Sequence, residues 1–95
     1  MADIDRRLAE LAERFAAQAG DAATSIAGSL ARRDWPALSA TCHSLAGRAG
    51  MFGHPDLGEA ARAVEEAIDE RADAARIEEL TELLLHHLEP LRQGR

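Results

Sequence analysis

The sequence predicts an all-α fold, namely an antiparallel up-down-up-down four-helix bundle with an additional N-terminal helix. Ala supplies 21 and Leu 12 of the 95 residues, and both residue types favour helices. Aromatic residues make up only 3%, which argues against a β-sandwich or barrel. Apolar residues recur every three or four positions, as one face of an amphipathic helix requires. Connections of only a few residues between such helices favour antiparallel packing.

The chain is short and acidic, which limits what it is expected to bind. A length of 95 residues suits one domain over 1–95. The net charge is −6 and all basic residues are Arg, so we expect no binding to nucleic acid or to an anionic membrane surface. No apolar run approaches the roughly 20 residues of a membrane span, and the N-terminal residues resemble no signal or transit peptide. We therefore expect a cytoplasmic protein, and a monomer.

The first two helices are expected on either side of Gly20. The first covers residues 3–19, and its apolar residues form one stripe of Ile4, Leu8, Leu11 and Phe15. Gly20 suits the left-handed conformation that ends a helix, and Asp21 suits the N-cap of a second helix over residues 21–33. We expect the first helix to cover one end or side of the bundle that the other four form.

Three further helices follow. The third is predicted over residues 34–52, beginning at the capping Asp34. The fourth is predicted over residues 55–71. The fifth begins at the capping Asp73 and is bent or ended by Pro90, which lacks an amide proton.

His43 points away from the predicted core face of the third helix, at about 100° per residue. A helix surface that faces solvent normally carries long polar side chains. A glycine inside a helix costs about 0.5 to 1 kcal/mol relative to alanine, so stability gives no reason for two glycines on this face. The pattern favours close approach of another molecule to the imidazole. The small residues around His43 include Ser39, Ala46, Gly47 and Gly50.

The segment HSLAGRAGMFG, residues 43–53, together with Leu57, resembles the histidine-containing phosphotransfer (HPt) domain of bacterial phosphorelays. The shared pattern is HxLxGxxxxxG followed by Leu four residues later. The resemblance implies a helical bundle in which His43 accepts a phosphoryl group from a receiver-domain aspartate and passes it to another receiver. It also implies a docking surface on the helices predicted over residues 21–33 and 34–52.

The same resemblance implies the partners and cofactors. The partners would be response-regulator receiver domains and a hybrid histidine kinase. Magnesium is expected in the receiver, and this chain needs no cofactor of its own. The sequence has neither a glycine-rich phosphate loop nor a basic cradle for ATP, so we expect a phosphotransfer intermediate rather than a self-sufficient enzyme. The alternative is a helical adaptor of the same fold that binds receiver domains or other signalling proteins without transferring phosphate.

Ala46 departs from the family pattern, and Arg48 and Glu65 have two interpretations each. The family often has Lys three residues after the histidine, where this sequence has Ala46. Arg48 either replaces that cation or packs along the helix and pairs with an acid on the helix over residues 55–71. The resemblance places Glu65 where the family commonly has a Gln or Glu that hydrogen-bonds the imidazole. A carboxylate accepting from Nδ1–H would leave Nε2 as the nucleophile; the other interpretation is a solvated surface Glu.

The remaining cysteine and histidines are expected to play no chemical role. Cys42 points about 100° away from His43 and suits a small filler at the edge of the core. His54, His86 and His87 lack the spacing of a metal site. We therefore expect no metal site in this chain.

Overall fold

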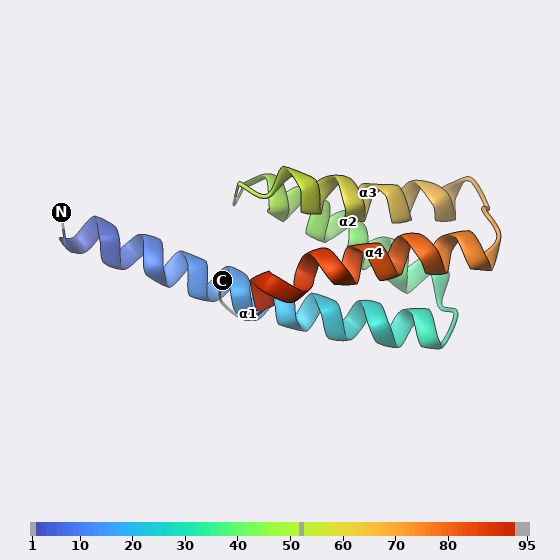
Figure 1. The fold of residues 1–95 in the computed structure, drawn as a ribbon, viewed down its shortest axis with the longest axis horizontal. Helices are drawn as coiled ribbons and strands as arrows, with labels where there is room; N and C mark the ends of the chain where they lie inside the picture. Colours follow the sequence, from blue (N-terminus) through green and yellow to red (C-terminus); the bar gives the residue numbers. More distant parts are fainter. Residues whose placement is uncertain (1, 52, 93–95) are drawn as a thin grey trace.

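The computed structural model describes residues 2–51 and 53–92, which contain four α-helices and no strand. The helices are α1 (Ala2–Ala31), α2 (Trp35–Met51), α3 (Pro55–Asp69) and α4 (Ala74–Arg92). In the bundle α2 packs against α1 and α3, and α4 packs against α3 and α1. The α1–α2 and α3–α4 connections lie at one end of the bundle and the α2–α3 connection at the other (Figure 1). The predicted all-α fold is confirmed.

One apolar core lies between the four helices, and each helix contributes to it. Helix α1 contributes Phe15, near its middle, and the fully buried Ile26, nearer its C-terminal end. None of the helices in the described residues is long and apolar enough to cross a membrane. The largest fully buried side chains are Ile26, Leu38, Leu45, Leu84, Leu88, Val64, Thr81 and Cys42.

The prediction of two separate helices on either side of Gly20 is wrong, because α1 is a single helix of 30 residues. Among the described glycines only Gly53 has a positive φ, so Gly20 does not adopt the conformation that ends a helix. A glycine inside a helix costs only about 1 kcal/mol. The neighbouring Ala19 and Ala22 are buried in the core, and their burial holds this part of α1 helical.

The first turns of α1 do not cover the bundle as expected, but extend beyond it (Figure 1). At 1.5 Å per residue, α1 is about 45 Å long, whereas α2 and α4 are about 26 and 28 Å long. Phe15 is only 4% exposed, whereas Ile4, Leu8 and Leu11 are 61%, 59% and 44% exposed. Of the four residues in the predicted stripe, only Phe15 is therefore buried in the bundle, and the other three are exposed.

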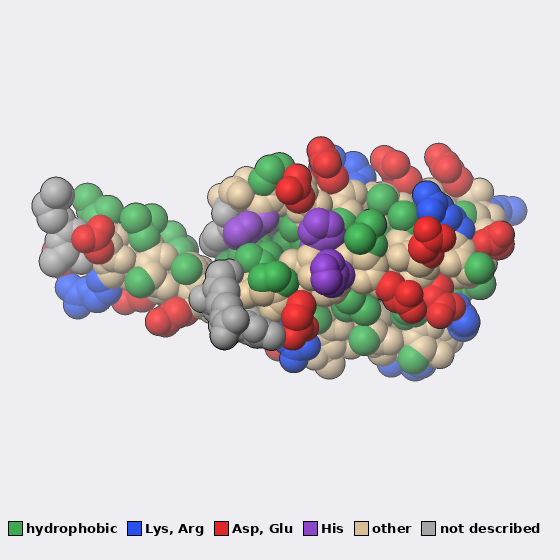
Figure 2. Space-filling view, in the orientation of Figure 1, with side chains coloured by type: hydrophobic (Ala, Val, Ile, Leu, Met, Phe, Trp, Pro, Cys, Tyr) green, Lys and Arg blue, Asp and Glu red, His purple; other side chains and the backbone are tan. Residues whose placement is uncertain are grey.

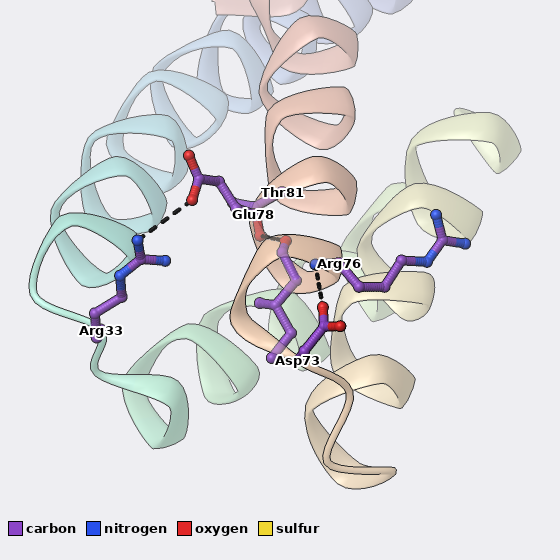
Figure 3. A network of polar contacts seen from close by, with 6 residues as sticks. Arg33, Asp73, Arg76, Glu78 and Thr81 are labelled. Atoms are coloured by element: carbon purple, nitrogen blue, oxygen red, sulfur yellow. Dashed lines mark hydrogen bonds and ion pairs between the residues drawn. The ribbon is translucent and has the colours of Figure 1, made fainter.

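Two aspartates cap helices as the sequence predicts. Oδ1 of Asp34 accepts from the backbone N–H of Ala37 at 3.2 Å at the start of α2. Oδ1 of Asp73 accepts from the backbone N–H of Arg76 at 2.8 Å at the start of α4 (Figure 3). These contacts satisfy amides that have no partner within their own helix.

An ion pair joins the capped ends. Nη2 of Arg33, in the α1–α2 connection, lies 3.3 Å from Oε2 of Glu78 on α4 (Figure 3). Both side chains are about half exposed, so the pair contributes at most about 1 kcal/mol.

The other predicted helix ends agree in part. Gly53 follows α2 with φ of +77°, as a helix stop requires. Phe52, the predicted last residue of that helix, lies outside the described residues. Pro90 lies inside α4, which continues to Arg92, so it does not end the helix.

The continuity of α1 predicts that Gly20→Ala stabilises the protein by about 0.5 to 1 kcal/mol, since alanine is the better helix former. A Cβ at Gly20 would make only an ordinary contact, 3.9 Å from Cβ of Arg92. Urea unfolding measures the change in free energy. Gly53→Ala is the control and should destabilise, because its φ of +77° is strained for alanine. Destabilisation by Gly20→Ala would mean that Gly20 interrupts the helix after all.

Candidate functional site

His43 lies in the middle of α2 with its side chain 77% exposed. The core side of the same helix buries Leu38, Cys42 and Leu45 completely or nearly so. His43 is therefore on the solvent side of α2, as the helical pattern predicts, and its ring is open to a second molecule.

Glu65 of α3 holds one nitrogen of this ring. Nδ1 of His43 and Oε2 of Glu65 are 2.7 Å apart, and the Glu65 side chain is only 23% exposed. An ionised carboxylate can only accept a hydrogen bond, so Nδ1–H is the donor. This contact fixes the tautomer of the neutral ring and leaves the lone pair on Nε2, the nitrogen on the far side of the ring from Glu65. Of the two interpretations of Glu65, this contact favours the one in which the carboxylate orients the imidazole.

Space is open around the exposed imidazole. A Cβ at Gly47 or Gly50 would meet no heavy atom within 4 Å. Both glycines are exposed and Ser39 is half-buried. Since larger residues would fit within the protein itself, internal packing does not explain the two glycines. Because they have no side chains, the surface beside His43 stays accessible to a second molecule.

Ala46 differs from its predicted position, because it is 8% exposed and belongs to the core. The core face of α2 is centred closer to Cys42 and Ala46 than the helical wheel indicates. The reason is the close approach of α3: a Cβ at Gly58 would lie 3.5 Å from the carbonyl oxygen of Ala46 and 3.7 Å from Cβ of Ala49. Ala46 is thus not part of the open surface beside His43.

Gly58 lies where α3 packs against α2, a contact that the sequence analysis missed. It is buried on α3 and lies seven residues before Glu65, which puts both on one face of the helix. A Cβ at Gly58 would make only ordinary contacts with α2, so the packing of α3 against α2, and not the missing side chain, brings the Glu65 carboxylate within hydrogen-bond distance of His43. A glycine inside a predicted helix, on its apolar side, was the available signal.

Arg48 points to α1 rather than to an acid on α3, so the predicted ion pair with the helix over residues 55–71 is wrong. Its Nη1 donates to Oε1 of Gln18 at 3.3 Å, and its Nε is buried without a hydrogen-bond partner. Helix α2 lies between α1 and α3, so the guanidinium and Glu65 are on different flanks of α2. The guanidinium borders a cavity of about 250 Å³ lined by Gln18, Asp21, Ala22, Ser25, Thr41, Ser44 and Arg48.

Cys42 is a buried filler, as predicted, with no exposed surface. Burial, and secondarily the negative charge of Glu65, raise the pKa of the Cys42 thiol to about 12. Since the thiolate is the reactive form, Cys42 is inert near neutral pH.

The other histidines lie away from His43. The ring of His54 stacks on Phe15 with centroids 5.2 Å apart, and His54 and His87 border a second cavity of about 250 Å³. Within residues 2–51 and 53–92, no group of three or more His, Cys, Asp or Glu side chains is arranged to hold a metal ion.

Comparison with known proteins identifies the family. The Hpt domain family model matches residues 10–94, nearly the whole chain. No curated protein and no solved structure matches the sequence. Hpt domains are histidine phosphotransfer modules of two-component phosphorelays, where they interact with receiver domains and kinases. The chain therefore belongs to the Hpt domain family.

Proposed function

We propose that this Hpt domain accepts a phosphoryl group on Nε2 of His43 from a receiver-domain aspartate and passes it to another receiver. The observation that carries this proposal is the exposed imidazole with its Nδ1 held 2.7 Å from Glu65. The open surface at Gly47 and Gly50 supports it, because phosphoryl transfer requires the two proteins to approach within bonding distance.

The transfer step follows from this geometry. The Nε2 lone pair attacks the phosphorus of the receiver's aspartyl phosphate, in line with the bond to the carboxylate oxygen. The N–P bond forms while that P–O bond breaks, and the aspartate leaves as a carboxylate. The ring then carries positive charge with its proton still on Nδ1, where the Glu65 carboxylate stabilises it. Onward transfer to a second receiver is the reverse of this step.

The phosphoryl group adds about −1.5 to −2 charges to a chain whose net charge is already −6. Ala46 offers no cation, and the hydrogen bond to Gln18 directs Arg48 toward α1. We therefore place charge neutralisation during transfer in the receiver, through its magnesium ion and basic side chains. The donor receiver on this account belongs to a hybrid histidine kinase.

His43→Gln should remain folded, because the side chain is 77% exposed, and should accept no phosphate. The wild type and His43→Gln are each incubated with a panel of radiolabelled phosphorylated receivers. The stability of the label in acid and in base is then measured. A phosphohistidine is acid-labile and base-stable.

Label that persists in His43→Gln, or that maps to His54, His86 or His87, would contradict the assignment. Binding of receivers by the wild type without any label would favour the adaptor alternative.

Glu65→Ala should slow transfer about tenfold, equivalent to about 1.4 kcal/mol of transition-state stabilisation, without unfolding the bundle. Glu65→Gln should recover part of the rate, because its amide oxygen can still accept from Nδ1–H. Nitrogen-15 NMR of the ring should show loss of the Nδ1–H tautomer in Glu65→Ala alone. The matched control is Glu66→Ala, an exposed neighbour. Equal effects of the two alanine variants would remove Glu65 from the site.

Gly47→Gln should keep or raise stability, since glycine is the poorer helix former and nothing lies within 4 Å of a Cβ there. It should nevertheless slow transfer from a receiver strongly, because the new side chain projects one turn after His43 on the same side. Phosphorylation by the small donor phosphoramidate should fall much less. An unchanged rate with the receiver would show that Gly47 has no role in access.

A further inference from the structure

The exposed stripe on the first turns of α1 lies outside the site described at His43 (Figure 1). The Hpt family match begins at residue 10, and His43 and Glu65 lie on other helices. The stripe consists of Ile4, Leu8 and Leu11, each between 44% and 61% exposed. Apolar side chains gather on the part of α1 that extends beyond the bundle (Figure 2). These turns of α1 lack the tertiary packing of an amphipathic face that supplies most helix stability in proteins, so this face calls for a partner.

We propose that the stripe is covered by the same stripe of a second copy of this chain, in an antiparallel helix pair. Pairing centred on Leu8 sets Ile4 of one copy against Leu11 of the other. The match in length supports this occupant, because the exposed part of the stripe ends at Phe15, which is 4% exposed and packs within the bundle. Each exposed stripe then stops where the bundle of the other copy begins, and the two bundles lie at opposite ends of the pair.

The charges beside the stripe support the same arrangement. Asp3, Arg7, Glu10 and Arg14 each precede one stripe residue, so they line one edge of the helix with alternating signs. In an antiparallel pair each such edge faces its own copy. Asp3 then faces Arg14 of the second copy, and Arg7 faces Glu10 of the second copy. In the single chain Asp3 pairs with Arg6 at 2.7 Å, but both side chains are more than two-thirds exposed, so this pair is exchanged at little cost.

A parallel pair of helices fits neither the length of the exposed stripe nor the charges beside it. It would bring the charged edge against the opposite edge, which carries Asp5 and Ala12. It would also force the two bundles together, because the stripe runs directly into the bundle at Phe15. This proposed dimer differs from the monomer expected from the sequence, because that expectation placed the first turns of α1 against their own bundle.

The size of the surface sets the strength of the dimer. Three partly exposed aliphatic side chains per copy amount to less than the roughly 800 Å² per partner of a standard interface. We therefore expect a dimer that dissociates on dilution through the micromolar range.

Sedimentation velocity of the full chain, from about 1 µM to 1 mM, tests the proposal. The wild type should shift from monomer to dimer as the concentration rises, and Leu8→Glu should stay monomeric. The matched control is Leu83→Glu on α4, since Leu83 is 52% exposed and outside the stripe; it should dimerise as the wild type does. Circular dichroism confirms that the variants remain helical. The proposal is overturned if the wild type stays monomeric over the whole concentration range. It is also overturned if Leu83→Glu loses as much dimer as Leu8→Glu does.

A charge exchange tests the register. Arg7→Glu should weaken the dimer at least tenfold, because two Glu–Glu contacts replace two Arg–Glu contacts. The double variant Arg7→Glu with Glu10→Arg should restore it, because the pairs re-form between copies. Failure of the double variant to recover overturns the antiparallel arrangement. If Leu8→Glu weakens binding to a receiver while the wild type stays monomeric, a receiver covers the stripe and the proposal is wrong. None of these outcomes depends on whether His43 is phosphorylated.

Discussion

The close contact between α2 and α3 is the constraint on which the site depends. At Gly58 of α3 a Cβ would lie 3.5 Å from the Ala46 carbonyl oxygen, an ordinary contact distance, so the two helices pack directly against each other here. This packing buries Ala46 and Ala49, and it brings Glu65 to 2.7 Å from Nδ1 of His43. A wider spacing would leave the imidazole free to rotate. The same packing that stabilises the bundle thus orients the ring.

The site is built for access and orientation, and it offers little charge. Around the imidazole the surface is low at Gly47 and Gly50, and the partly buried group that touches the ring is an acid. Arg48, the nearest arginine in sequence, is turned toward Gln18 on the other flank of α2. On the proposed function, the docked receiver supplies the positive charge that this site lacks.

Much of this could be predicted from the sequence, because helical periodicity and capping residues act locally. Asp34, Asp73 and Gly53 mark helix ends that the structure contains, and the outward direction of His43 follows from its position among buried leucines. Predictions failed where packing against neighbouring helices determines the burial or the direction of a residue. Gly20 does not end α1 because the alanines beside it are buried in the bundle. Ala46 is buried next to α3, and Arg48 faces α1. A helical wheel of α2 alone could predict neither, because it does not contain the positions of the neighbouring helices.

The proposed phosphotransfer depends on the contact between Glu65 and Nδ1 of His43, which leaves Nε2 free to bond to phosphorus. Phosphorus–nitrogen NMR correlation of the phosphorylated chain tests it most directly, because the coupling identifies the ring nitrogen that carries the phosphoryl group. We expect a single phosphohistidine at residue 43, with phosphorus on Nε2 and the proton retained on Nδ1. Phosphorus on Nδ1 of His43, or on any other histidine, would contradict it.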